Sequence, residues 1–288
     1  MQKLFWNSTI FASLALAAAA AAAATPTYTN LYVFGDSYCD VGNVAIATGG
    51  QRPGPMYFEG RFSNGWLWVD HIAKYLGLPL SPSLSGGTDY AFAGAWVTAP
   101  GNGVPPVPQQ VQMYLSATGG KADPNALYFI DGGGNDIVET TSGNPNALGY
   151  QIAAGIADSE LMLRRAGARH FIIPNLFNVG LLPVTADHVA FAAAASASAN
   201  YWLNKLLWFD QQLPRVHILR PDINSLINAI EKDKYHFGFT DMSDPCLTAS
   251  GVCADPDHTF FWDVYHPTVF GHAFFAVAIE TALAQPND

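Results

Sequence analysis

A serine that could act as a nucleophile follows a short apolar run early in the chain. Residues 31–34 (LYVF) have the character of a buried strand, and they lead into the corner Gly35-Asp36-Ser37. A serine at this place lies outside the carboxyl end of a strand, where open α/β sheets bind their ligands. Its hydroxyl is then accessible, and its backbone N–H can point to an oxygen that becomes negative. Ser37 could instead only cap the next helix, as serines often do.

The base for such a serine would be a histidine held by a carboxylate. The spacing Asp-x-x-His is a weak signal, because it occurs three times: Asp233 and His236, Asp255 and His258, Asp263 and His266. The third pair stands apart, since residues 260–262 (FFW) precede it and Pro267 is placed for the first turn of a helix over 269–284. A helix entry would fix the imidazole of His266, and Asp263 can reach its other nitrogen.

An amide side chain follows a second apolar run. Residues 126–130 (ALYFI) have the character of a buried strand, and the turn 131–136 (DGGGND) comes directly after it. Its glycines let the backbone approach a ligand closely, and Asn135 offers N–H donors at the sheet edge where Ser37 is expected. A glycine-rich turn could instead hold phosphate, but the dinucleotide pattern G-x-G-x-x-G fails because Ile137 replaces its last glycine.

Several segments, in this order, resemble the GDSL (SGNH) esterase/lipase family, and the resemblance covers roughly residues 29–284. They are FGDS at 34–37, DVGN at 40–43, GRFSNGW at 60–66, YAFAGA at 90–95, GGND at 133–136, AGAR and IPNL within 166–176, and WDVYHPT at 262–268. Two departures occur. Tyr38 replaces the usual leucine after the serine, and Ala93-Gly94 follows Asp89 where the family usually shows two glycines and a leading asparagine.

The resemblance implies a role for each of these residues. Ser37 would be the nucleophile, and its backbone N–H would form an oxyanion hole with the N–H of Gly94 and the side chain of Asn135. Because a backbone donor tolerates either residue, Ala93 is the alternative to Gly94. No cofactor is implied.

Alternating strands and helices would position these side chains. Besides 31–34 and 126–130, we expect strands at 171–173 and 216–219 and a weaker one near 90–92. Helical patterns cover 66–76, 147–165 and 187–212. Five strands separated by helices predict a three-layer α/β/α sandwich around a parallel, flavodoxin-like sheet of about five strands.

Composition limits the possible functions. The chain is 50% hydrophobic and 12% charged, with a net charge of −10, which is typical of a large core and argues against disorder and nucleic-acid binding. Residues 1–24 combine Lys3 with an apolar alanine-rich run, as a secretory signal peptide does. The run is too short for a membrane anchor. We therefore expect a secreted protein, extracellular or periplasmic, with a single domain over 25–288 and no membrane span after cleavage.

The three cysteines fit that compartment. Cys246 and Cys253 flank a short loop and predict a local disulfide in an oxidising environment. Cys39 is then unpaired, and a small buried residue under the Ser37 corner explains it better than a catalytic thiol does.

These residues together predict a carboxylic ester hydrolase. His266 would take the proton of Ser37, Asp263 would orient His266, and an acyl-enzyme would form and be hydrolysed. The expected substrates are short-chain or acetyl esters, whether small molecules, lipids or acetylated saccharides. Lipid acyl transfer and phospholipase action would use the same site. Two rivals differ in class: a metal site at Asp36, Asp136, Asp263 and His266, which lacks a typical zinc spacing, and a non-enzymatic α/β binding domain.

Overall fold

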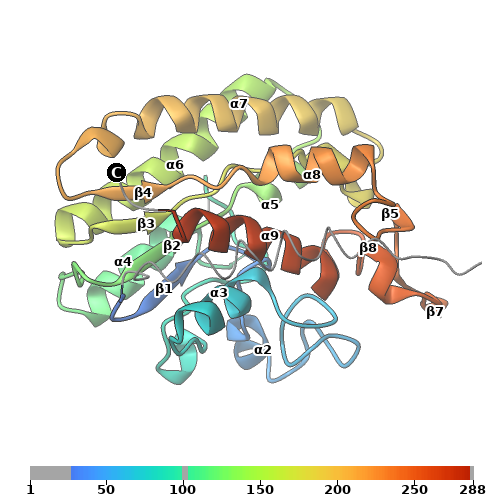
Figure 1. Cartoon of the computed structure of the whole chain (residues 1–288), viewed down its shortest axis with the longest axis horizontal. Coiled ribbons are helices and arrows are strands. Elements are labelled where there is room, and N and C mark those ends of the chain that lie inside the picture. The colour runs from blue at the N-terminus through green and yellow to red at the C-terminus, as the bar shows by residue number, and fades with distance from the viewer. Residues whose placement is uncertain (1–26, 99–102, 286–288) are drawn as a thin grey trace, which may run out of the picture.

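Four short parallel strands form the centre of the fold, which a computed structural model describes for residues 27–98 and 103–285 (Figure 1). They lie in the order β1 (Leu31–Phe34), β2 (Leu127–Ile130), β3 (His170–Ile172) and β4 (His217–Leu219). In this register Leu31 pairs with Leu127, Leu127 with His170, and His170 with His217. The predicted signal peptide over 1–24 lies outside the described residues.

Both faces of the sheet are covered by helices, which is why its strands are almost wholly apolar. Every residue of β2 is buried, and successive side chains enter two different cores. The helices are α2 (Asn43–Ala47), α3 (Trp68–Leu76), α4 (Val107–Ala117), α5 (Gly134–Val138), α6 (Pro145–Ala166), α7 (Val189–Leu207), α8 (Ile223–Lys232) and α9 (Val269–Leu283). Leu127 and Phe129 pack in the core that includes α3, α8 and α9, whereas Tyr128 and Ile130 pack in the core with α4, α6 and α7.

The predicted fold class, an α/β sandwich around a parallel sheet, is confirmed, but the fifth strand is reduced to one bridge. Asp89 pairs with Val33 there, and residues 90–92 are not a strand. The carbonyls of Asp89 and Ala91 accept hydrogen bonds from the Asn43 side chain, both at 2.9 Å. The segment thus helps to attach the corner after Ser37. The strand is not extended because the N–H of Gly35 donates to the Gln110 side chain at 2.9 Å and not to this segment.

A small outer region precedes the last helix. Strand β5 (Asp241–Pro245) runs parallel to β8 (Thr259–Phe261), and the hairpin β6 (Leu247–Thr248) and β7 (Gly251–Val252) lies between them in sequence. Backbone N–H groups of Cys246 and Leu247 bond to the carbonyls of Phe261 and Trp262. The outer region therefore holds the chain just before Asp263.

In the part of the chain that the structure describes, none of the helices combines the length and the apolar character that a membrane crossing needs.

Candidate active site

Three side chains that are far apart in the sequence meet at the carboxyl edge of the sheet. Ser37 follows β1, and Asp263 and His266 lie between β8 and α9. The Nε2 atom of His266 lies 2.8 Å from the Oγ of Ser37, and its Nδ1 lies 2.7 Å from Oδ2 and 2.8 Å from Oδ1 of Asp263. All three residues are at most 9% exposed. This is the geometry of a nucleophile, a base and an orienting carboxylate.

The carboxylate of Asp263 is held in its ionised form. Its Oδ1 accepts the backbone N–H groups of Tyr265 at 2.7 Å and of His266 at 2.8 Å. Burial alone would raise the pKa of Asp263, but the neighbouring imidazole and the donated hydrogen bonds outweigh burial and lower that pKa. A negative charge is therefore available to stabilise an imidazolium at His266.

Ser37, Gly94 and Asn135 line the same cavity, whose volume is about 250 Å³. Gly94 has a φ of 86°, in the left-handed region that favours glycine. The N–H of Ala93 donates to Oδ2 of Asp40 at 2.9 Å, which favours Gly94 over Ala93 as the backbone donor. The amide of Asn135 is held by bonds from Nδ2 to the Ala95 carbonyl at 3.0 Å and to Asp36 at 3.3 Å.

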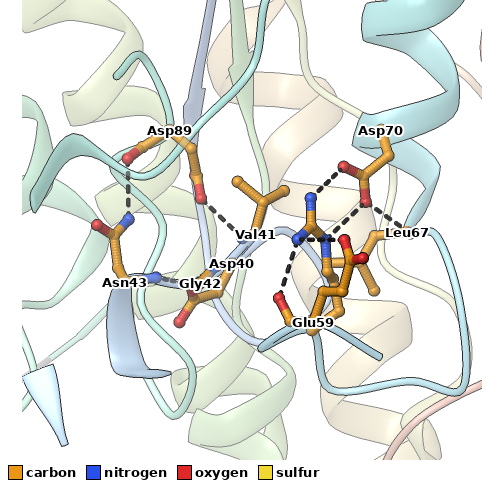
Figure 2. A network of polar contacts seen from close by, with 9 residues as sticks. Asp40, Val41, Gly42, Asn43, Glu59, Leu67, Asp70 and Asp89 are labelled. Atoms are coloured by element: carbon orange, nitrogen blue, oxygen red, sulfur yellow. Dashed lines mark hydrogen bonds and ion pairs between the residues drawn. The ribbon is translucent and has the colours of Figure 1, made fainter. Parts of the chain in front are cut away.

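Buried carboxylates attach the corner after Ser37 to the segment that carries Gly94 (Figure 2). The Oδ1 of Asp40 accepts the N–H groups of Gly42 at 2.8 Å and of Asn43, while its Oδ2 reaches Ala93. The Oδ2 of Asp89 accepts the N–H of Val41 at 2.8 Å. Burial raises the pKa of both Asp40 and Asp89, against the effect of the donors. We call this assembly of residues 36–43 and 89–94 the nucleophile side.

The loop of residues 57–65 holds the other half of the site. Ser63 Oγ donates to the carbonyl of Pro267 at 2.8 Å, and Asn64 Oδ1 accepts the N–H of Val269 at 2.7 Å. Arg61 connects the loop to α3, since its guanidinium donates to Asp70 Oδ1 and to the Glu59 carbonyl, both at 2.9 Å; Figure 2 shows Glu59, Asp70 and Leu67 around these contacts. We call residues 57–65 with 263–269 the base side.

The lining of the cavity combines large apolar side chains with polar groups, among them the carboxyl groups of Asp36 and Asp131. Large apolar side chains from four parts of the fold line it: Trp68, Phe177, Leu182, Ile223 and Phe275. Burial raises the pKa of Asp36 to about 6. Burial and then the charge of Asp36 raise that of Asp131 to about 8.

The other sequence candidates lie elsewhere. His258 pairs with Asp255 at 2.8 Å on the surface, and His236 is exposed. Cys39 is fully buried and accepts a hydrogen bond from the Trp68 indole at 3.3 Å. Asp136, part of the rival metal site, accepts the N–H groups of Val97 and Thr98. Among residues 27–98 and 103–285, no group of three His, Cys, Asp or Glu residues could hold a metal ion.

The predicted disulfide forms between Cys246 and Cys253, and it closes the hairpin of β6 and β7. Two contributions were missed in the sequence. Tyr57, whose hydroxyl donates to Asp263 Oδ2 at 2.7 Å, lies outside the segments that resemble the family. Asp40 lies inside one, but no local pattern indicates that its carboxylate bonds to Ala93, across 53 positions.

Comparison with known sequences identifies the family of this chain. The family described as GDSL-like Lipase/Acylhydrolase matches residues 31–279. The chain belongs to this family. The predicted resemblance is thus confirmed, and membership supports ester hydrolysis, lipase action or acyl transfer by a serine enzyme as the class of chemistry.

The names of proteins similar to this chain include a hemolysin, an esterase/lipase and an acyltransferase. The chain is 28% identical to the thermolabile hemolysin of Vibrio parahaemolyticus over 84% of this chain and 60% of that protein. It is 27% identical to a GDSL esterase/lipase of Arabidopsis thaliana (83% and 78%) and 25% identical to a phosphatidylcholine-sterol acyltransferase of Aeromonas hydrophila (79% and 68%). The chain thus spans about 60% of the length of the hemolysin.

Among solved structures, a lipolytic G-D-S-L family protein of Veillonella parvula has a TM-score of 0.49 at 14% identity, covering 87% of this chain and 96% of that one. The carbohydrate acetylesterase Est24 of Sinorhizobium meliloti has a TM-score of 0.47 at 14% identity, covering 88% and 98%.

Proposed function

We propose that this protein is an exported carboxylic ester hydrolase that works through Ser37, His266 and Asp263. The observation that carries the proposal is the unbroken chain of contacts from Ser37 Oγ through both ring nitrogens of His266 to Asp263. It opens into a cavity that Gly94 and Asn135 also line. A nucleophile, a base, an orienting carboxylate and oxyanion donors at one cavity are the requirements of acyl transfer.

The reaction has two halves in this proposal. His266 Nε2 takes the proton of Ser37 as Oγ attacks the ester carbonyl, and Asp263 stabilises the imidazolium that forms. The carbonyl oxygen becomes negative, and the N–H groups of Ser37 and Gly94 and the Asn135 side chain stabilise it. His266 then protonates the leaving alcohol, which leaves the acyl group on Ser37. Water, deprotonated by His266, attacks the acyl-enzyme and releases the acid.

The cavity supports a short to medium acyl chain. Its large apolar side chains suit a hydrocarbon tail, and a volume of about 250 Å³ limits the length of that tail. We therefore expect acetyl and short-chain esters to react faster than long-chain esters. Export is part of the proposal: it is supported by the leader pattern of residues 1–24 and by the Cys246–Cys253 disulfide. A single domain over 25–288 is also proposed.

Acyl transfer to an alcohol is the second candidate, supported by the similarity to the acyltransferase of Aeromonas hydrophila. The same residues would form the acyl-enzyme, and an alcohol would replace water in the second half of the reaction. Product analysis with and without an added alcohol distinguishes the two: a new ester indicates transfer, and free acid alone indicates hydrolysis.

Covalent labelling tests the proposal. A fluorophosphonate probe should label the protein once, at Ser37, and Ser37→Ala should abolish both labelling and hydrolysis of nitrophenyl esters. A chain-length series of these esters, run beside an acetylated saccharide and a phospholipid, identifies the acyl and alcohol preferences. Labelling that survives in Ser37→Ala would rule out Ser37 as the nucleophile.

A further inference from the structure

One donor to the carboxylate of Asp263 has no assigned role, and it comes from a loop remote in the sequence. We propose that Tyr57 is a positioning residue of the triad: its hydroxyl fixes the orientation of Asp263 and reduces the pull of this carboxylate on the imidazole proton. The proposal rests on the proposed function of Ser37, Asp263 and His266, and it adds a residue that sets how basic His266 is.

The contact is specific to one oxygen. The Tyr57 hydroxyl donates to Oδ2 of Asp263 at 2.7 Å, and the same Oδ2 lies 2.7 Å from Nδ1 of His266. The other oxygen, Oδ1, takes the backbone N–H groups of Tyr265 and His266 and lies 2.8 Å from the same Nδ1. Tyr57 and the imidazole therefore share one carboxylate oxygen. Each bond that Oδ2 accepts reduces the charge that it presents to the other donor.

Tyr57 remains a donor throughout the working pH range. Burial and then the charge of Asp263 raise the pKa of the phenol well above its usual value. A phenolate is thus excluded near neutral pH, and the hydroxyl has a proton to donate wherever His266 can act as a base.

Packing holds the phenol in this place. The Tyr57 ring lies 6.0 Å from the ring of Phe62 and 6.4 Å from that of Trp262, which immediately precedes Asp263. The Phe62 ring in turn lies 5.3 Å from the imidazole of His266. Tyr57 therefore packs beside Trp262, the neighbour of Asp263, and beside Phe62, which contacts His266. These two aromatic contacts hold the phenol near Asp263.

The sign of the effect follows from the shared oxygen. Without the hydroxyl, Oδ2 carries more negative charge toward Nδ1, and the imidazolium becomes more stable relative to the neutral ring. The imidazole is then protonated at higher pH, where it can no longer accept the proton of Ser37. The acid limb of the kcat/KM profile must move to higher pH.

The substitution Tyr57→Phe leaves the other groups around the imidazole unchanged, so comparing this variant with wild type isolates the effect of the Tyr57 hydroxyl. The titratable or charged groups that face His266, apart from Asp263 and Tyr57, are Asp36, Tyr38, Tyr265, His272 and, across the Phe62 ring, Arg52. His272 is buried, and burial followed by the charge of His266 holds its pKa well below the usual value. It stays neutral in both proteins.

The test is Tyr57→Phe, which removes one oxygen and keeps the ring. We expect the acid limb of kcat/KM to move up by about half a pH unit, and the plateau kcat to fall about two- to tenfold, because Asp263 is held less firmly. Proton NMR of the Nδ1–H resonance, followed against pH, should show the same upward displacement without depending on turnover.

Tyr38→Phe is the matched control. Its hydroxyl donates to the carbonyl of Tyr265 at 2.7 Å, so the variant also loses one tyrosine hydrogen bond to the segment 263–266 but changes no bond at the carboxylate. It should leave the midpoint of the acid limb unchanged. In an Asp263→Asn background, Tyr57→Phe should have no further effect on the pH profile, because its target charge is gone.

An unshifted limb and an unshifted Nδ1–H titration in Tyr57→Phe would overturn the proposal, and so would an equal shift in Tyr38→Phe. Should the wild-type protein hydrolyse no ester in the series, the proposed function fails instead. The NMR comparison of Tyr57→Phe with wild type then still decides whether Tyr57 acts on the acid–base pair.

Discussion

The two halves of the site are held in opposite ways. On the nucleophile side, Asp40 and Asp89 are wholly buried, and their carboxylates accept backbone N–H groups from two chain segments. On the base side, Ser63 and Asn64 reach from a loop to backbone groups of the segment that enters α9. The first half is held by buried carboxyl groups that accept backbone N–H groups, and the loop is attached to the entry of α9 by the neutral side chains of Ser63 and Asn64.

This difference separates a fixed half from an adjustable one. A buried carboxylate is costly unless donors surround it, so losing either the charge or a donor affects the whole assembly. A neutral hydrogen bond between a loop and a backbone carbonyl contributes only about 1 kcal/mol. Substitutions on the nucleophile side should therefore cause large losses of stability and activity. Substitutions on the base side should cause small losses, unless they replace a reacting group.

The largest expected effect comes from the base itself. His266→Ala should lower kcat by about 10⁴-fold or more, as the loss of a triad member does, with little change in substrate binding. Steady-state kinetics on a nitrophenyl ester measure both quantities. His258→Ala and His236→Ala remove the other two Asp-x-x-His histidines and should stay near wild type. If His258→Ala were inactive and His266→Ala active, the base would be His258, and the proposed pair of Asp263 and His266 would be wrong.

The proposed oxyanion donor Asn135, which comes from α5 and belongs to neither side, should have the next largest effect. Asn135→Ala should lower kcat by about 10²- to 10³-fold, because one hydrogen bond to the developing negative charge is lost. Asn175→Ala is the matched control. Asn175 also lines the cavity, and its amide is likewise held within the protein, by Asp222 at 2.6 Å. It is not one of the proposed oxyanion donors, and we expect less than about a tenfold change. Equal losses in the two variants would show that cavity shape, and not an oxyanion bond, is affected.

Asp40→Asn tests the internal attachment of the nucleophile side. The amide keeps the shape of the carboxylate but turns N–H atoms toward N–H donors that include Gly42, Asn43 and Ala93. We expect a loss of about 2–4 kcal/mol in the free energy of unfolding, measured by urea denaturation. The kcat should fall as well, because the turn that carries Gly94 is released. Unchanged stability would show that the carboxylate is not needed for this attachment.

The smallest effect should come from the loop. Ser63→Ala removes the hydrogen bond to the Pro267 carbonyl and should cost about 1 kcal/mol, or about 2–4 °C in Tm. Activity at low temperature should change little, because Asn64 still holds Val269. Calorimetry beside Asp40→Asn compares the two sides directly. A loss as large as that of Asp40→Asn would contradict the contrast between them.

Much of the catalytic geometry could be predicted because it is encoded in short segments. A strand followed by a serine, and an aspartate three residues before a histidine at a helix entry, are local patterns that survive without knowledge of the fold.

The features that were missed depend on long-range contacts. Tyr57 bonds to a residue 206 positions away, and no periodicity marks its loop. The weak strand at 90–92 fails for a related reason: the N–H of Gly35, which would continue the ladder, donates to the side chain of Gln110 at 2.9 Å, a partner that no pattern within the segment indicates. The helix predicted over 187–212 ends at Leu207, and a short 3₁₀ turn over Asp210–Gln212 follows.

The separation between the nucleophile and its base has a consequence for when activity can arise. Ser37 and His266 are 229 positions apart, and all four strands of the central sheet precede Asp263 in the chain. During synthesis, the strands and the serine therefore leave the ribosome before the base does. A chain that ends before Asp263 would possess the sheet and the serine but no group to take its proton. The proposed hydrolase would be inert as a growing chain, and its activity would begin only when the last segment docks.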